Sequence, residues 1–391
     1  MSDKRSERPG PRVPLLAAAG FCGNISWQLV LPVLPLHLAH IGYSPAQIGL
    51  LISVLSLVMG TVELQAGFIA SAVGRRAALV TGFSMNAICL VLASLARSAG
   101  AVASTLGAIG GARAVFVPPL QAAVAESSTA STRGRVLSMY WFWASTATLV
   151  GPAIGGFIAA RHGDRAPFYL ASAMSVLALP AVAAATAPRH ARPKGSFREL
   201  TGVLANGPVV RLCAACMLCF SISGLWSTFL PLQMARHGLS VAVVGWVFTV
   251  QGCLYTLMQI ATGRMISHRR ADWLAPAGIV GMSTAAVLVP FLHTTAAFLM
   301  LGAAYGASFG VIPVTFATRV TWRMARDSYT TAMGVYNSAI DYGLFLGPLL
   351  GGALALISAV PPFGLALPLG LAALIISRDP AGTARVADAE D

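Results

Sequence analysis

The sequence predicts an all-α integral membrane protein whose twelve transmembrane helices form two six-helix bundles. Three observations carry this prediction: an apolar composition, apolar blocks that recur along the whole chain, and an internal repeat. The chain has 391 residues, of which 56% are hydrophobic and 10% are charged. A soluble domain carries about 25% charged residues, so this chain cannot cover a water-facing surface. Each apolar block is about 20 residues or longer, which is enough to cross ~30 Å of hydrocarbon.

The apolar blocks place the helices in chain order. The run from Val13 to His40 is about twice as long as the apolar core of a cleavable signal peptide, so we expect it to be retained as the first span. The last block is the shortest and is rich in proline. We expect spans at 14–39, 45–71, 77–97, 100–126, 133–160, 166–187, 208–234, 240–266, 273–293, 295–321, 331–357 and 361–377.

The longest polar stretch, 188–207, divides these spans six and six. We therefore expect an N-terminal bundle over 1–187, a cytoplasmic linker over 188–207 and a C-terminal bundle over 208–391. The chain holds 26 Lys and Arg residues, and a cytoplasmic N-terminus would leave only four of them outside: Arg97, Arg161, Arg165 and Arg236. Basic residues concentrate in cytoplasmic loops, so both termini are expected in the cytoplasm of a cell-membrane protein.

The net charge of +13 therefore reflects membrane orientation, and nucleic acid is not an expected partner. We expect a monomer in the lipid bilayer. The sequence has no His/Asp metal spacing, no nucleophile–base pair in the spans and no phosphate-binding loop of the form Gly-x4-Gly-Lys-Ser/Thr. It therefore predicts no cofactor, no metal and no enzyme; an intramembrane enzyme or a lipid-handling protein is the alternative from another class.

The two halves are related by an offset of 196 residues. Over positions 34–71 this offset gives 11 identities in 38 positions without a gap, including Gly42 with Gly238 and Gly49 with Gly245. Matching glycines are informative because they mark backbone geometry. An even number of spans per half preserves orientation, so the repeats are parallel and related by an axis along the membrane normal.

A glycine–proline motif occurs in the fifth span and again in the eleventh. Glycines at this spacing let another backbone approach closely, and the proline bends its helix. The alternative interpretation is ordinary packing of small residues, but two copies at repeat-related positions favour a conformational role. The motifs are Ala147-x3-Gly151-Pro152-x2-Gly155-Gly156 and Gly343-x3-Gly347-Pro348-x2-Gly351-Gly352.

On these residues the sequence resembles the major facilitator superfamily, and the fifth-span motif resembles the antiporter signature of its drug–proton exchangers. The loop after the second span resembles the family's Gly-x3-Asp-Arg-x-Gly-Arg loop at Gly67, Gly74 and Arg75. Ser71 replaces the aspartate, which weakens the expected charge latch between the second and eleventh spans. Glu126-x6-Arg133-Gly134 resembles the family's acidic–basic clasp between the fourth and fifth spans.

Buried charge supplies the candidates for proton coupling: Glu63, Asp341 and Arg113, the last of which resembles the family's intramembrane arginine. A charge at the centre of a span costs ~2.5–3.5 kcal/mol, so its presence needs a reason. With ~1.5 Å of rise per residue, Glu63 and Asp341 lie at similar depth. The alternative is that each charge is neutralised separately and is only structural.

The resemblance also implies that spans one, four, seven and ten line a central cavity. The candidate substrate-binding residues are Asn24, Trp27, Gln28, Trp226, Tyr305 and Asn337. The expected function is secondary transport by alternating access, in which a small amphipathic molecule is exported in exchange for protons. A proton-coupled importer of a sugar or an organic acid on the same fold remains the alternative.

Overall fold

A computed structural model describes residues 12–63, 65, 73–127, 133–185, 197–324, 329–357 and 362–378. The first half contains α1 (Arg12–Val30), α2 (Leu34–His40), α3 (Pro45–Glu63), α5 (Arg75–Leu95), α6 (Ala99–Glu126), α7 (Arg133–His162) and α8 (Ala166–Ala185). The second half contains α9 (Phe197–Ala205), α10 (Gly207–Arg236), α11 (Val241–Met265), α12 (His268–Leu288), α13 (Thr295–Thr321), α14 (Tyr329–Ile357) and α15 (Ala366–Ser377), with 3-10 turns at Val289–Phe291 and Pro362–Leu365.

Eleven segments of the described chain are long and apolar enough to cross a membrane, and the shorter apolar segment Pro362–Ser377 is the twelfth. The predicted twelve-span fold is confirmed. Within the stretch expected as a linker, residues 188–196 lie outside the described part. The remainder contains a helix that the apolar blocks did not predict, α9, which packs on α10 and α14.

The first span is broken rather than continuous. It consists of α1 and α2, with a turn at Leu31–Val33 between them. Pro35 stands in the first turn of α2, where its missing N–H is tolerated and its fixed φ starts a new helix. The proline therefore gives the span a hinge between α1 and α2.

A polar cluster anchors α2 to the connection between α7 and α8. His37 Nδ1 lies 2.8 Å from Asp164 Oδ2, and the Nδ1 of His40 lies 3.4 Å from the same oxygen. The ring of His37 is almost completely buried, whereas that of His40 is exposed. Burial raises the pKa of Asp164, but the hydrogen bonds from the two histidines outweigh it and hold the pKa below its ordinary value.

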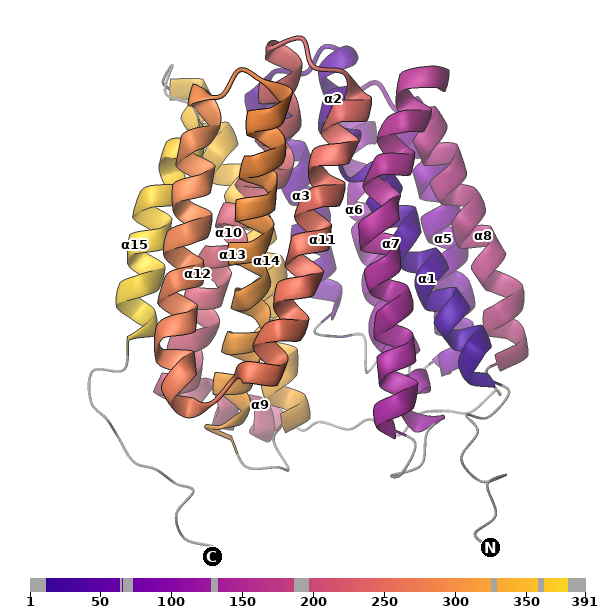
Figure 1. Ribbon diagram of the computed structural model, residues 1–391. Helices are drawn as coiled ribbons and strands as arrows, with labels where there is room; N and C mark the ends of the chain where they lie inside the picture. Colours follow the sequence, from indigo (N-terminus) through magenta and orange to yellow (C-terminus); the bar gives the residue numbers. More distant parts are fainter. Residues whose placement is uncertain are drawn as a thin grey trace, which may run out of the picture.

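The helices of each half pack in the same pattern. In the first half, α1 packs on α7 and α8, and α6 packs on α3 and α5; in the second half, α10 packs on α14 and α15, and α13 packs on α11 and α12. The halves meet where α3 packs on α14 and α7 packs on α11 (Figure 1). The sequence repeat is therefore also a structural repeat, and the second span packs on the eleventh as the fifth packs on the eighth.

The two ends of the molecule differ. The beginning of α1 and the end of α15 lie at one end, called here the terminal end, while α2 and the beginnings of α3 and α11 lie at the far end (Figure 1). The ribbons of α7 and α11 are close at the far end and diverge toward the terminal end (Figure 1). The contact between α7 and α11 is thus closest at the far end, whereas α3 and α14 pack from Gly49 to Gly60.

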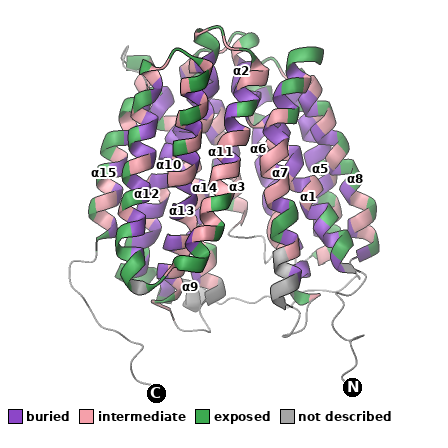
Figure 2. Cartoon of the chain, viewed as in Figure 1, coloured by how far each residue is buried: buried purple, intermediate pink, exposed green. Residues whose placement is uncertain are grey.

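The outer surface is apolar, as a lipid-facing surface must be. Large side chains such as Phe291, Met300 and Ile357 are 70%, 68% and 82% exposed on it. Figure 2 shows the buried residues gathered on the inward faces of the helices and the exposed residues on the outward faces. A soluble monomer rarely exposes apolar patches of this extent, so the bilayer is the solvent for this surface.

Candidate functional site

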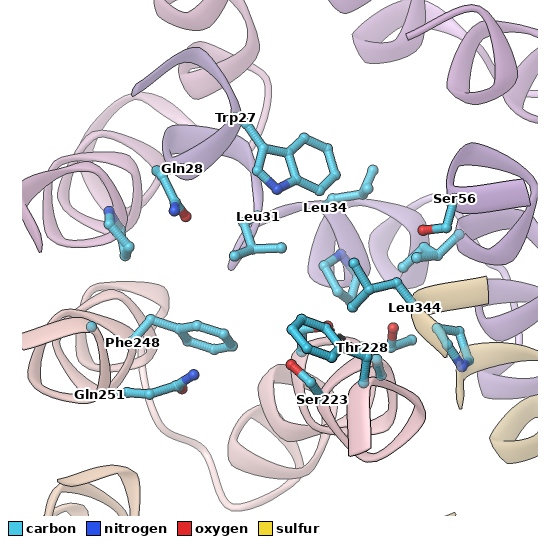
Figure 3. A pocket seen from close by; sticks show the side chains of 18 of the residues that line it. Trp27, Gln28, Leu31, Leu34, Ser56, Ser223, Thr228, Phe248, Gln251 and Leu344 are labelled. Carbon is cyan, nitrogen blue, oxygen red and sulfur yellow. Dashed lines mark hydrogen bonds between the residues drawn. The ribbon is translucent and has the colours of Figure 1, made fainter. Parts of the chain in front are cut away.

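A cavity of about 300 Å³ lies between the two halves. The first half contributes residues of α1, α2, α3 and α7, and the second half contributes residues of α10, α11, α13 and α14 (Figure 3). No lining residue in the described part of the chain carries a charge, and none comes from α6, the fourth span. The expectation that span four lines the cavity is therefore wrong for this cavity.

Five aromatic side chains contribute to its wall, beside a larger number of aliphatic and proline residues. The aromatic side chains come from both halves and comprise Trp27, Phe220, Phe248, Tyr255 and Phe309. Tyr255 and Phe309 stack with their ring centroids 5.3 Å apart. Such a wall gives large apolar contact area to a bound molecule through flat, rigid faces.

Two glutamines face the cavity from opposite halves, Gln28 from α1 and Gln251 from α11 (Figure 3). Gln28 Nε2 donates to Thr148 Oγ1 at 3.0 Å. Gln251 Oε1 accepts from Trp226 Nε1 at 2.8 Å. Each amide is thus held in place through one of its two ends. A few polar groups that fix orientation among many apolar ones are typical of small-molecule sites.

Of the six predicted cavity residues, the structure places Trp27 and Gln28 on the wall. Trp226 and Tyr305 lie behind it: they are almost completely buried and their rings stack with centroids 3.9 Å apart and planes 11° apart. They contribute indirectly, because Trp226 holds Gln251. Two positions do not line the cavity: Asn24, whose side chain donates to Gly20 O of its own helix, and Asn337, which is half-buried on α14.

Arg113 lies behind the wall as well. Its Nη1 donates to Gly23 O at 3.3 Å, and its guanidinium lies 5.3 Å from the ring centroid of Trp27. In the described part of the chain it forms no ion pair with a carboxylate. A backbone carbonyl of α1 therefore accepts the hydrogen bond of this buried guanidinium.

Glu63 and Asp341 meet at the interface of α3 and α14. Each carboxyl group lies within electrostatic reach of the other and of Arg113, and Asp341 Oδ2 is buried without a hydrogen-bond partner in the described part of the chain. Asp341 is 5% exposed, and its Cβ would lie 2.9 Å from a Cβ added at Gly60, one helical turn before Glu63. Two acidic groups this close cannot both be ionised without strong repulsion. The structure thus brings together the three charges that the sequence singled out.

The glycines of the two motifs face different partners. A Cβ added at Gly151 or Gly155 would collide with Gln28 or Leu29 of α1, and one added at Gly347 or Gly351 would collide with α10. These four glycines therefore pack inside their own halves.

The contact between halves is made by the last glycine of each motif. A Cβ at Gly156 would lie 3.0 Å from the Cα of Gly245 in α11, and one at Gly352 would lie 3.3 Å from the Cα of Gly49 in α3. Gly49 and Gly245 in turn pack against carbonyl groups of the motif prolines, Pro348 and Pro152. Backbone thus touches backbone at two repeat-related crossings near the far end.

The loop after the second span is described only in part, and Gly67 lies outside the described residues. Gly74 has φ of +86°, a backbone conformation that favours glycine, immediately before α5. Arg75 donates from both terminal nitrogens to the Glu126 carboxylate, at 2.6 and 2.8 Å. This bidentate pair ties the start of α5 to the end of α6. The side chain of Arg133, the expected partner of Glu126, is not described.

A family model and several curated proteins match this chain over most of its length. The profile of the Major Facilitator Superfamily matches residues 16–237 and 211–391. Among curated proteins, the chain is 23% identical to Multidrug resistance protein 1 of Bacillus subtilis, covering 96% of this chain and 98% of that protein. It is 25% identical to the Multidrug efflux protein YfmO of the same organism, with 92% of each chain covered. It is 21% identical to the Quinolone resistance protein NorA of Staphylococcus aureus, covering 89% and 91%.

Solved structures share the fold at lower identity. A crystal structure of a point mutant of the nucleoside transporter NupG matches with a TM-score of 0.80 and 12% identity, covering 94% of this chain and 98% of that chain. A bacterial homologue of the human lysosomal transporter Spinster, in an inward-facing and unoccupied conformation, matches with a TM-score of 0.73 and 14% identity, covering 96% and 93%.

Proposed function

This chain belongs to the major facilitator superfamily of transporters, and from that premise we propose that it exports a small amphipathic molecule in exchange for protons. The observation that carries the proposal is the aromatic, uncharged cavity between the two halves. Its position on the axis that relates the halves is where parallel-repeat transporters bind their substrates. Rocking of one half against the other would expose this cavity to each side of the membrane in turn.

The orientation follows from charge. If basic residues mark the cytoplasmic side, the terminal end is cytoplasmic and the far end faces outward. The glycine crossings then close the cavity toward the outside, and the conformation is inward-facing. Arg75, at the start of α5, belongs to the terminal end, whereas Arg236, at the end of α10, belongs to the far end. This placement agrees with the count of basic residues.

Export is favoured over import by the relatives that the chain resembles along its whole length, which are named as drug-resistance and efflux proteins. The Gly-Pro-x-x-Gly-Gly pattern of α7 supports the same direction. The similarity in fold to a nucleoside transporter keeps proton-coupled import as the second candidate. Both candidates use the same cavity and differ in the relative direction of substrate and proton.

The proton link is proposed to use the Glu63–Asp341 pair. Close approach of the two carboxyl groups favours a state in which they share a proton. The pair bridges α3 and α14, which belong to different halves, so its protonation state can bias how the halves meet. Arg113, in electrostatic reach of both, stabilises the deprotonated form.

Transport in proteoliposomes tests the proposal. The purified chain would be reconstituted in known orientation, with a pH gradient of either sign imposed and a panel of radiolabelled amphipathic compounds added. An exchanger moves substrate into the compartment that protons leave, so accumulation in an acidic lumen is expected and should collapse with nigericin. Accumulation in an alkaline lumen would establish the symporter instead.

A further inference from the structure

The hydrogen bonds of the two cavity glutamines determine which end of each amide is available to a substrate. Gln251 contacts the indole Nε1 of Trp226, which can only donate. The Gln251 oxygen must therefore point at Trp226, and its NH2 group is the free end. Trp226 is 1% exposed and stacked on Tyr305, so this orientation is fixed by a rigid support.

Gln28 is oriented in the opposite sense. Thr148 Oγ1 donates its single proton to Ala144 O of its own helix, at 3.3 Å, and so must accept from its other neighbour. The neighbour is Gln28 Nε2, at 3.0 Å. The Gln28 oxygen is therefore the free end. In the described part of the chain, no further hydrogen bond engages Gln28 Oε1 or Gln251 Nε2.

The cavity thus offers one acceptor from the first half and one donor from the second. Between them the wall is aromatic, with Trp27 on the side of Gln28 and Phe248 on the side of Gln251 (Figure 3). A flat molecule that carries a hydrogen-bond donor and a hydrogen-bond acceptor can offer the donor to Gln28 and the acceptor to Gln251.

Charge is disfavoured in this space. None of the lining residues is charged, and Arg113 is turned toward Gly23 O with Trp27 between its guanidinium and the cavity. A permanently charged ligand would lose its hydration here without gaining an opposite charge, which is costly. The nearest fixed positive charge would also repel a cation.

Resting on the proposed function, we propose that the cavity selects uncharged, planar molecules that carry an N–H, which donates to Gln28 Oε1, and a C=O, which accepts from Gln251 Nε2. The two residues belong to different halves, so a molecule that uses both bonds bridges the halves as it binds. The pair is a specificity determinant: it selects such a molecule over the same ring system without the N–H and over its cationic form.

Three probes with one ring skeleton test this selection: phenanthridinone, N-methylphenanthridinone and the N-methylphenanthridinium cation. Affinities would be measured by calorimetry on the full chain in lipid nanodiscs, with empty nanodiscs as blank. Phenanthridinone is expected to bind about tenfold more tightly than its N-methyl derivative, because one buried hydrogen bond is lost, and more tightly than the cation.

Substitutions of the two glutamines test the two proposed hydrogen bonds one at a time. Gln28→Met should lower the affinity for phenanthridinone about tenfold and leave that for N-methylphenanthridinone unchanged, because the latter has no N–H to lose. Gln251→Glu keeps an acceptor for Trp226 but replaces the donor by an anionic oxygen, so it should reverse the preference toward the cation. Gln233→Met, outside the cavity on α10, is the control and should change none of the affinities.

The inference is overturned if the cation binds as tightly as phenanthridinone to the unaltered chain, if Gln28→Met weakens both neutral probes equally, or if none of the probes binds. Binding is measured without a gradient, so these results do not depend on transport direction. A chain that shows the expected selectivity but fails the proteoliposome assay would overturn the export proposal alone.

Discussion

The crossing of Gly352 with α3 offers a direct test of how the cavity is closed. A Cβ at Gly352 would lie 2.8 Å from Ala46 O and 3.3 Å from the Cα of Gly49, both in the other half. The neighbouring Gly351 points elsewhere: its Cβ would meet the side chains of Leu225 and Phe229 in α10. Gly352→Ala therefore adds a methyl group between the halves, and Gly351→Ala adds the same group within one half.

The expected size of the effect follows from overpacking, which costs about 1–3 kcal/mol when a methyl group enters a tight contact. Backbone atoms surround the Gly352 methyl group, so little of this cost can be relieved by side-chain rotation. The cost applies only while the far end is closed. The higher helix propensity of alanine over glycine, about 1 kcal/mol, is present in both conformations and cancels. Gly352→Ala should therefore shift the equilibrium toward the open far end by about 5- to 150-fold.

Alkylation of a single cysteine measures this shift. Thr228, 1% exposed and on the cavity wall, is a suitable position in a background whose six native cysteines have been replaced. A membrane-impermeant maleimide would be applied from the side of the far end. Gly352→Ala should raise the labelling rate by the same factor as the equilibrium, whereas Gly351→Ala should not. Equal rates in the two variants would refute the assignment of Gly352 to the contact between halves.

Three further outcomes are expected. Glu63→Gln and Asp341→Asn should each abolish gradient-driven transport and leave substrate exchange intact, as measured in proteoliposomes; normal pH-dependent driven transport in both variants would show that the pair is only structural. The pKa of Asp164 is depressed, so its contribution to stability is present above the ordinary carboxyl pKa of about 4 and is lost as pH falls below it. Thermal unfolding in detergent should show this loss of stability between about pH 5 and 3, and the loss should be smaller in Asp164→Asn. Identical pH profiles of the two proteins would contradict a stabilising interaction of Asp164 with His37 and His40. Arg75→Ala removes an ion pair whose carboxylate is largely exposed, so it should lower the free energy of unfolding by at most about 1 kcal/mol, and a larger loss in denaturant titration would show that the pair acts in a network.

The spans were predictable because each needs only a long apolar block, and composition alone shows it. The break after α1 could have been predicted, because Pro32 and Pro35 interrupt the second half of the first apolar block. The helix α9 was not, because it is short and lies in a polar stretch, where its nine residues do not resemble a span.

The motif glycines show a different kind of limit. Gly155 and Gly156 are adjacent, so they point about 100° apart on α7 and face different helices. Both faces are buried and both tolerate only small residues, so the sequence cannot say which glycine touches the other half. That distinction comes from the rotation of α7 about its axis, which is fixed by tertiary packing.

Trp27 and Gln28 were predicted, but the cavity residues of the other spans, Gln251 among them, were missed for a related reason. Gln251 lies in an apolar span and is its most central amide, but the family pattern directed attention to spans one, four, seven and ten. Trp226 and Tyr305 were correctly placed in the interior and wrongly placed on the wall. To predict that these two rings stack, one would have to know that α10 and α13 turn them toward each other.

The repeat relates the glycines that join the two halves to one another, but it does not relate the residues proposed to bind substrate and protons. The crossings that join the halves are symmetric. Gly49 and Gly245 occupy equivalent positions of the two repeats, and so do Gly156 and Gly352. The residues proposed to bind substrate and protons are not symmetric: the repeat partner of Gln251 is Leu55, which lines the same cavity, and that of Glu63 is Gln259.

Symmetric crossings suit a closure that must form and break equally well on either side of the axis. An asymmetric cavity and a one-sided acid pair suit a cycle with a direction. If the donor, the acceptor and the titrating pair had symmetric copies, a substrate would have two equivalent ways to bind and a proton two equivalent places to sit. Under the proposed function, loss of symmetry at these few positions would give one binding pose and one proton site on a scaffold that remains symmetric.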